Sequence, residues 1–178
     1  MSRKEQDERY MREALELARS SEEADEIPVG AVVVLADEII GRGSNRPIAS
    51  HDPTAHAEII ALREAALRVA NYRLAGATLF VTVEPCVMCA GAIVSARIDR
   101  LVFAARDLRF GAVRSKFKLA DSELMNHQVT VTEGVFAAEA GELLVGFLQR
   151  ARKRNPRLRG MGPSQAGSYG AIDPTRHK

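Results

Sequence analysis

The chain of 178 residues has an ordinary globular composition, with 46% hydrophobic and 27% charged residues. This length suits one domain with a sizeable core, and the longest apolar run, residues 29–36, is far too short to cross a bilayer. The two cysteines lie three positions apart, which argues against a disulfide scaffold and favours metal or redox chemistry. The first eight residues lack the apolar run of a secretory signal, so we expect a cytoplasmic protein without a membrane anchor.

Apolar periodicity and turn residues divide the chain into helices and strands. Apolar residues between Met11 and Ala18 have the spacing of an amphipathic helix. A β-branched run that ends at Leu35 and the turn residues Asp37-Glu38 predict a hairpin, and the glycines that follow predict a loop. In chain order, the predicted elements are a helix over about residues 5–20, strands over 29–35 and from 39, a loop over 41–47, a helix over 54–70, a strand over 77–83, a helix over 86–97, strands over 101–104 and 129–131, and a helix from 137 to about 154.

This order of elements predicts an α/β fold, a three-layer α/β/α sandwich in which helices pack on a mixed five-stranded sheet. We expect the folded domain to comprise residues 1–159. From residue 160 onward, Gly, Ser and Pro recur with few large apolar residues, and this composition predicts a disordered tail over residues 160–178. The sequence shows no internal repeat and no sign of a second domain.

Charge is distributed unevenly along the chain, although the formal net charge is +2. Residues 1–30 carry nine acids and five bases, whereas residues 149–160 carry six bases and no acid. Such a basic block can bind phosphates by releasing counterions, and it is equally typical of a solvated helix end. The six bases are Arg150, Arg152, Lys153, Arg154, Arg157 and Arg159.

Two short segments carry residues suited to catalysis, His56-Ala57-Glu58 and Pro85-Cys86-Val87-Met88-Cys89. Each lies where a loop or strand leads into a predicted helix, so His56 and both cysteines are expected in first helical turns, near free backbone N–H groups. This setting favours thiolate over thiol. Two thiolates and one imidazole can bind zinc, and three protein ligands leave a fourth position for water, as in a catalytic zinc centre.

Glu58 is the informative neighbour of these ligands. A carboxylate two residues after His56 can face the open position of the metal, where zinc lowers the pKa of bound water to about 7. Glu58 could take the proton of that water, deliver it to a substrate ring and later protonate a leaving amine. Hydrolytic deamination requires this combination of a metal-activated water and a carboxyl group that works in both directions.

Each segment alone has other interpretations. Cys-x-x-Cys is equally typical of a thioredoxin-like redox pair, and a histidine in a first helical turn is more often a surface or core residue. The sequence alone does not exclude His51, His127 or His177 as ligands. Together, however, His-x-Glu and Pro-Cys-x-x-Cys match the signature of the zinc deaminases that act on nucleobases.

With these residues in view, the chain closely resembles the bacterial tRNA-specific adenosine deaminases of the cytidine deaminase superfamily. The resemblance runs from about Tyr10 to Arg154. The two longest matching strings, His51 to Glu58 and Glu84 to Ala92, point to the tRNA branch. The shorter matching segments are Ile27-Pro28-Val29-Gly30-Ala31-Val32, Asn45-Arg46-Pro47, Asn71-Tyr72-Arg73-Leu74, Ala105-Arg106-Asp107 and Met125-Asn126-His127.

The resemblance implies a cytidine deaminase-like fold and hydrolysis of the wobble adenosine of a tRNA anticodon to inosine. It further implies a homodimer with one zinc ion in each subunit. By position, the zinc ligands would be His56, Cys86 and Cys89, and Glu58 would carry the proton. Substrate contacts would come from Asn45, which would hydrogen-bond the target base, from the backbone beside Ala57 and Cys86, and from Asp107, which would meet the flipped nucleotide or its neighbour.

These substrate roles have plain structural alternatives. The sequence alone favours a turn residue in a Gly-Pro loop for Asn45, and Asp107 could be a loop acid or a helix cap. Val113-Arg114 stands where small residues are commoner in the family, and Ser95 replaces a frequent histidine. These departures concern the expected RNA-binding loop around residues 108–118 rather than the metal ligands.

Three rival functions share part of the pattern. A deaminase of free guanine, cytosine or a nucleoside would keep Glu58 and the three ligands but would not need the basic block. A structural zinc module would leave Glu58 and the missing fourth ligand unexplained. A thiol redox protein would purify without stoichiometric zinc.

Overall fold

The computed structural model describes residues 2–154. Its elements follow the predicted order, with one short helix added. They are α1 (Arg3–Glu23), β1 (Gly30–Leu35), β2 (Glu38–Ser44), α2 (Pro47–Ser50), α3 (Ala57–Arg68), β3 (Thr78–Val83), α4 (Val87–Ser95), β4 (Arg100–Ala105), β5 (Thr130–Glu133) and α5 (Ala137–Arg154).

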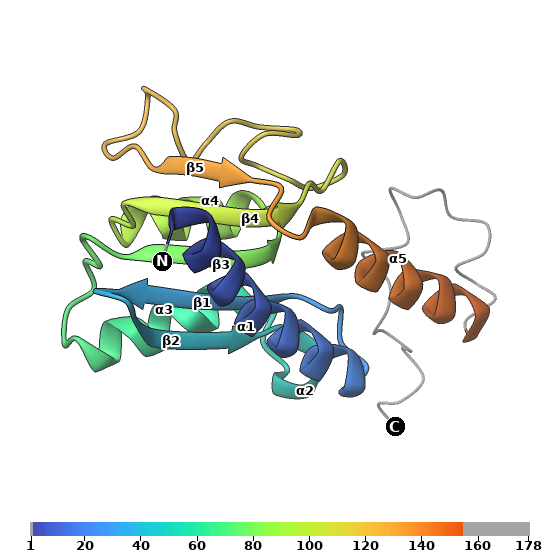
Figure 1. Cartoon of the computed structure of the whole chain (residues 1–178). Helices are drawn as coiled ribbons and strands as arrows, with labels where there is room; N and C mark the ends of the chain where they lie inside the picture. The colour runs from blue at the N-terminus through green and yellow to red at the C-terminus, as the bar shows by residue number, and fades with distance from the viewer. Residues whose placement is uncertain (1, 155–178) are drawn as a thin grey trace.

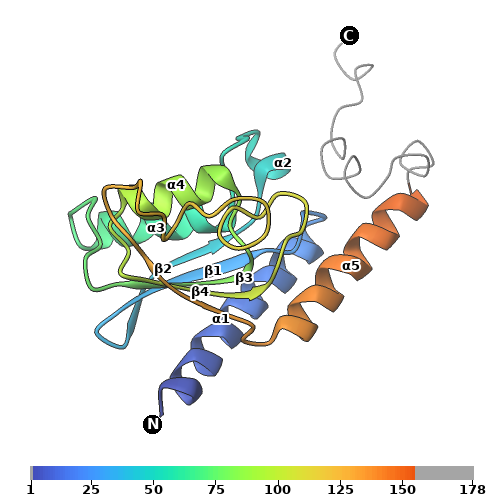
Figure 2. The same cartoon turned by 90° about the horizontal axis from the view of Figure 1, so that it is seen from above.

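The five strands form one mixed sheet in the order β2-β1-β3-β4-β5. β1 runs antiparallel to both of its neighbours, whereas β3, β4 and β5 are parallel. Seen from above, α3 and α4 lie on one side of this sheet and α1 and α5 lie on the other (Figure 2). The predicted α/β/α sandwich with a mixed sheet is therefore confirmed.

A separate apolar core fills each side of the sheet. On the side of α3 and α4, side chains such as Leu79, Phe103 and Ile93 are fully buried. On the side of α1 and α5, Met11 and Phe80 belong to a second cluster of buried apolar side chains. The central strands contribute to both clusters, because successive side chains point to opposite faces of a strand.

The loop predicted over residues 41–47 is wrong in its first part, because β2 continues to Ser44. The two glycines that suggested a loop instead allow α3 to pack closely on the sheet. A Cβ atom at Gly41 would lie 2.2 Å from the carbonyl oxygen of Ala61, and one at Gly43 would lie 2.0 Å from that of Ala57. Glycine within a strand often marks such a close approach of another backbone.

Two helix boundaries also differ from the sequence prediction. Residues 47–50 form α2, with Pro47 at its start, a position where proline favours a helix. α3 begins at Ala57 rather than at residue 54, because residues 52–55 form a turn in which the Asp52 carboxylate accepts hydrogen bonds from Thr54. His56 therefore stands directly at the entry of α3 rather than inside it.

The fold brings the ends of several elements together at one edge of the sheet. β3 ends at Val83, and α4 begins four residues later. The first residue of β1, Gly30, pairs with the last residue of β2, Ser44, so that β2 leads to Asn45 at this same edge. Figure 1 shows α2 at this end of β2. Residues 45, 56–58 and 83–89 thus approach one another from separate parts of the chain.

The predicted domain boundary after residue 159 and the tail over residues 160–178 lie outside the described residues. Arg157 and Arg159 lie there too. Within residues 2–154, no helix combines the length and apolar character needed to span a membrane.

Candidate metal centre and active site

The three candidate ligands lie at the entries of two helices. His56 is the N-cap of α3 and Cys86 is the N-cap of α4, both with extended backbone. Cys89 is the third residue of α4 and is fully buried. The first turn of a helix leaves backbone N–H groups unpaired and carries positive partial charge, which stabilises thiolates. The prediction placed all three ligands in first helical turns; this is confirmed for Cys89, whereas His56 and Cys86 stand one residue earlier, at the N-caps.

The spacing of the three ligand atoms fits one tetrahedral metal ion. Nδ1 of His56 lies 3.7 Å from Sγ of Cys86 and 3.5 Å from Sγ of Cys89. Zinc bonds of ~2.3 Å to sulfur and ~2.0–2.1 Å to nitrogen, at tetrahedral angles, place such ligand atoms about 3.6 Å apart. All three atoms lie within 4.8 Å of one another. In residues 2–154, no fourth His, Cys, Asp or Glu joins this group.

The ionisation of the three ligands is strongly coupled. A hydrogen bond from Cys89, opposed by burial and assisted by His56, lowers the pKa of Cys86 to about 4. The same interaction with Cys86, together with burial, raises the pKa of Cys89. The hydrogen bond to Cys86 raises the pKa of His56. Cys86 is therefore already a thiolate at neutral pH, the form in which cysteine binds metal.

Glu58 is buried beside the ligand group. It is the second residue of α3 and is 4% exposed. Burial is the dominant influence and raises the pKa of its carboxyl group. A buried carboxyl group with a raised pKa is suited to general acid–base catalysis near neutral pH, because it can both accept and return a proton.

The structure gives the burial and the hydrogen bonds of the residues expected to contact the substrate. Asn45 follows β2 and is 6% exposed, and its backbone N–H donates to the carbonyl of Val29. Ala57 is the first residue of α3 and is completely buried. The Oδ1 atom of Asp107 accepts hydrogen bonds from the backbone N–H groups of Arg109 and Phe110. Asp107 therefore stabilises the turn that follows it, whatever else it contacts.

Sequence reasoning missed Glu84, which directly precedes Pro85 of the metal motif. This side chain is 3% exposed and accepts hydrogen bonds from residues 107 and 113–115. Burial alone would raise the pKa of Glu84, but hydrogen bonds from Ser115 and from the backbone of residues 113–115 lower it overall. The available signal was a glutamate at the end of a strand whose last five residues are buried.

The described part of the basic block lies at the end of α5, and two of its four cations face acids near the end of α1. Arg150 pairs with Glu22 and Arg154 pairs with Asp25. Arg152 and Lys153 make no ion pair in the described part of the chain. Positive charge at this surface is thus partly neutralised within the molecule.

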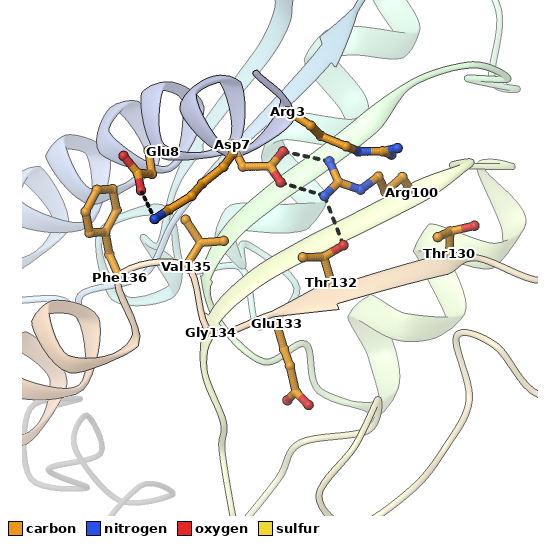
Figure 3. A pocket seen from close by; sticks show the side chains of 11 residues that line it. Arg3, Asp7, Glu8, Arg100, Thr130, Thr132, Glu133, Gly134, Val135 and Phe136 are labelled. Carbon is orange, nitrogen blue, oxygen red and sulfur yellow. Dashed lines mark hydrogen bonds and ion pairs between the residues drawn. The ribbon is translucent and has the colours of Figure 1, made fainter. Parts of the chain in front are cut away.

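A cavity of about 660 Å³ lies away from the ligand group, between α1, Arg100 at the start of β4, and residues 130–136, which comprise β5 and the segment after it (Figure 3). Its wall contains a buried ion pair in which Arg100 donates to both carboxylate oxygens of Asp7 at 2.7 Å and to Thr132 at 2.9 Å. Arg100 opens β4, whereas Cys86 follows the end of the parallel strand β3. Arg100 therefore lies at the opposite end of the strands from Cys86, and no residue that lines the cavity belongs to the candidate active site.

Comparison with known proteins decides the family. Residues 4–105 match the cytidine and deoxycytidylate deaminase zinc-binding region. The chain is 55% identical over 152 residues to a tRNA-specific adenosine deaminase of Haemophilus influenzae, across 85% of this chain and 88% of that protein. It is 42% identical over 154 residues to a tRNA-specific adenosine deaminase of Bacillus subtilis, across 86% of this chain and 96% of that protein. The chain therefore belongs to the family of cytidine and deoxycytidylate deaminases that this zinc-binding region defines.

Solved structures support the same assignment. A structure from a study of A-to-I editing by tRNA:A34 deaminases at the wobble position matches with a TM-score of 0.74 and 44% identity, covering 76% of this chain and 99% of that one. A guanine deaminase from Nitrosomonas europaea matches with a TM-score of 0.68 and 30% identity, covering 79% of this chain and 83% of that one. The predicted cytidine deaminase-like fold is confirmed, and the match to the zinc-binding region favours zinc in the His56, Cys86 and Cys89 group.

We expect the Cys86→Ala/Cys89→Ala variant to bind no zinc, because it removes both sulfur ligands. The His56→Ala variant should retain well below one equivalent of zinc per chain. Metal analysis of the purified proteins measures both. The control is His51→Asn, since His51 is exposed, lies outside the ligand group and has a left-handed backbone that asparagine tolerates. Full zinc content in the double cysteine variant would contradict the assignment.

We expect Glu58→Gln to keep its zinc but to lose turnover by roughly 10²–10⁴-fold, the usual contribution of general acid–base catalysis. The amide has the size of the carboxyl group but cannot carry a proton between two sites. Single-turnover assays measure the chemical step. Glu64→Gln, on the exposed face of the same helix, is the matched control and should retain wild-type turnover. A Glu58→Gln protein with near-normal chemistry would remove Glu58 from the mechanism.

Proposed function

We propose that this protein hydrolyses the wobble adenosine of a tRNA anticodon to inosine, with release of ammonia. The observation that carries the proposal is the buried carboxyl group of Glu58 beside three correctly spaced ligand atoms, in a chain 55% identical to a tRNA-specific adenosine deaminase. The reaction replaces the amino group on C6 of the purine by the oxygen of water.

One zinc ion per chain would be held by His56, Cys86 and Cys89. The fit rests on the 3.5 and 3.7 Å distances and on a donor set of two sulfurs and one imidazole nitrogen, which zinc prefers. Zinc, when bound, supplies the Lewis acidity that makes water a nucleophile near neutral pH. Three protein ligands suit a catalytic rather than a structural ion, because a structural site is normally closed by four.

Glu58 would move the protons of the reaction. Its carboxylate accepts a proton from the attacking water and passes it to a ring nitrogen of the purine. It then takes the second proton of the water, from the hydroxyl group now bonded to C6, and delivers it to the departing amine, so that the C–N bond breaks, the carbonyl forms and the leaving group is neutral ammonia. Burial assists both steps, since it raises the pKa of Glu58 above its ordinary value and excludes competing water.

The base pocket would be bordered by Asn45, Ala57 and Asp107. The buried amide of Asn45 can pair with a purine edge through one donor and one acceptor. The backbone at Ala57, at the first turn of α3, lies next to both His56 and Glu58. An anticodon loop suits this pocket, because a single-stranded base can be turned out and buried at small unstacking cost.

The wider surface would engage the rest of the RNA. We propose that Arg150, Arg152, Lys153 and Arg154 contact phosphates of the anticodon stem-loop. Two of these cations face acids of the same chain, so binding RNA would exchange an internal ion pair for a phosphate contact. The family resemblance supports two further proposals, a homodimer and a cytoplasmic location.

A deaminase of free bases remains the competing function, and one observation bears on it directly. The structure shares its fold with a guanine deaminase. The identity to that protein is 30%, however, against 55% and 42% to tRNA-specific adenosine deaminases over similar shares of the chain. The higher identity to the tRNA-specific adenosine deaminases therefore favours the RNA substrate.

The decisive experiment offers the protein an anticodon stem-loop with adenosine at the wobble position, and separately free adenosine, cytidine and guanine. We expect inosine in the stem-loop, and a kcat/KM for free nucleosides and bases lower by at least about 10²-fold, because they lack the phosphate and loop contacts that supply binding energy. A stem-loop with guanosine at the wobble position is the negative control. Equal efficiency on a free nucleoside or base would replace the tRNA function by that of a small-molecule deaminase.

We expect Arg150→Gln/Lys153→Gln/Arg154→Gln to weaken stem-loop binding and to flatten its salt dependence. In a plot of log affinity against log salt, the slope should fall by ~0.7–0.9 for each phosphate that the variant no longer neutralises. Zinc content should stay at the wild-type level. The matched control is Glu22→Gln/Asp25→Asn, which frees Arg150 and Arg154 from their partners and should strengthen binding. An unchanged salt slope in the first variant would show that the block is only a solvated helix end.

A further inference from the structure

We infer that Glu84 is a positioning residue, which holds the segment 107–115 against the metal-binding motif and so sets the wall of the substrate pocket. The effect of this anchor on catalysis rests on the proposed function. The anchor itself is visible in the hydrogen bonds of the protein. Glu84 contacts neither the ligand atoms nor the proposed proton path, so it would act through the segment it holds.

Both carboxylate oxygens of Glu84 are used, and every partner belongs to the same segment. Oε1 accepts the backbone N–H groups of Val113, Arg114 and Ser115 at 3.0, 2.6 and 2.9 Å. Oε2 accepts the N–H of Asp107 at 3.1 Å and the hydroxyl of Ser115. One side chain thus closes both ends of a loop whose residues are 23–31 positions away in sequence.

Such an arrangement binds a carboxylate firmly. Three consecutive N–H groups aimed at one oxygen form an anion-binding concavity, and hydrogen bonds to a charged acceptor are stronger than neutral ones. With Glu84 only 3% exposed, water cannot replace the carboxylate if that group is removed. Each N–H group would then be left buried without an acceptor, which is costly. The segment therefore depends on the carboxylate for its conformation.

Gly111 shows how closely the segment is fitted to this anchor. A Cβ atom at Gly111 would lie 2.4 Å from the carboxylate of Glu84 and 2.5 Å from the carbonyl oxygen of Asp107. Any side chain at position 111 would therefore push the segment away from Glu84. The N–H of Ala112 also donates to the carbonyl of Pro85 at 2.8 Å, and Gly111 forms a β-bridge with Cys86.

The anchor is placed to control the pocket. Glu84 is two residues before Cys86, one of the three ligand residues, and it holds the N–H of Asp107, a proposed substrate contact. The turn after Asp107 carries Leu108 and Phe110, which are 71% and 46% exposed. A shift of this turn would move all three side chains relative to the metal site. Misplacement by ~1 Å at an active site can cost about 10²-fold in rate.

The first test measures the anchor without any substrate. Glu84→Gln replaces one acceptor oxygen by an amide that donates, so at least part of the N–H set loses its partner. We expect amide hydrogen exchange at residues 113–115 to accelerate by about tenfold or more, with exchange in β1 and β3 unchanged. Ser115→Ala, which removes one hydrogen bond, should show a smaller change in the same direction. If Glu84→Gln fails to fold, the exchange measurement on Ser115→Ala tests the anchor in its place.

The second test measures the consequence with zinc-loaded protein and the anticodon stem-loop. We expect kcat/KM to fall by about 10–100-fold in Glu84→Gln at wild-type zinc content. Gly111→Ala should produce a comparable loss, and the Glu84→Gln/Gly111→Ala double variant should be little worse than either, because both changes release the same segment. Asp7→Asn is the matched control. It disturbs another buried carboxylate, at the far edge of the sheet, and should lower Tm while keeping kcat/KM below its melting range.

Each outcome decides a separate point. Unchanged exchange at residues 113–115 in Glu84→Gln overturns the anchor. Faster exchange with unchanged kcat/KM, or additive losses in the double variant, overturns the positioning role. Absence of inosine from the wild-type reaction overturns the proposed function instead, and the exchange measurement still decides whether Glu84 holds the segment.

Discussion

The active-site geometry depends on one constraint, that two helices begin side by side at the same edge of the sheet (Figure 2). The distances of 3.5 and 3.7 Å between Nδ1 of His56 and the two sulfur atoms exist only because α3 and α4 enter side by side. Close packing makes this possible. α3 rests directly on the backbone of β2 at Gly41 and Gly43, where even a methyl group would collide with the helix. Two glycines, one of them packed against Ala57 between His56 and Glu58, therefore help to set the ligand spacing.

The sequence predicted those parts of this site whose residues lie close together along the chain. His56, Glu58 and the Cys86–Cys89 pair lie in short motifs at helix entries, and residue spacing alone carries much of their meaning. The layers and the element order were also predictable, because apolar periodicity reports burial along each element. The glycines of β2 were misread as a loop, since glycine favours both turns and close backbone approach, and only the partner helix tells these apart. The pairs of Arg150 with Glu22 and of Arg154 with Asp25, near the end of α1, could not be predicted either, because about 130 residues separate the partners.

Glu84 illustrates the same limit within the site itself. A glutamate at the end of a buried strand is locally unusual, but its partners lie in a segment with no regular secondary structure. Nothing in local spacing connects position 84 to positions 113–115. The structure shows that a buried carboxylate can replace a strand or helix as the scaffold of such a segment, since it satisfies four backbone N–H groups at once. Val113-Arg114, which departs from the commoner small residues, contributes through backbone groups that any residue other than proline supplies.

The catalytic group alone does not choose the substrate. A histidine, two cysteines and a buried glutamate serve the same hydrolysis on any amino-substituted ring that reaches them, and a guanine deaminase shares this fold. Selection must come from the walls and the surroundings of the pocket, such as the exposed side chains of Leu108 and Phe110 on the anchored segment. Exposed apolar and aromatic side chains are suited to unstacked bases and the cations of α5 to phosphates, and a free nucleobase offers no phosphate. A rigid catalytic centre combined with a separately anchored wall would allow relatives to change substrate without changing the reaction.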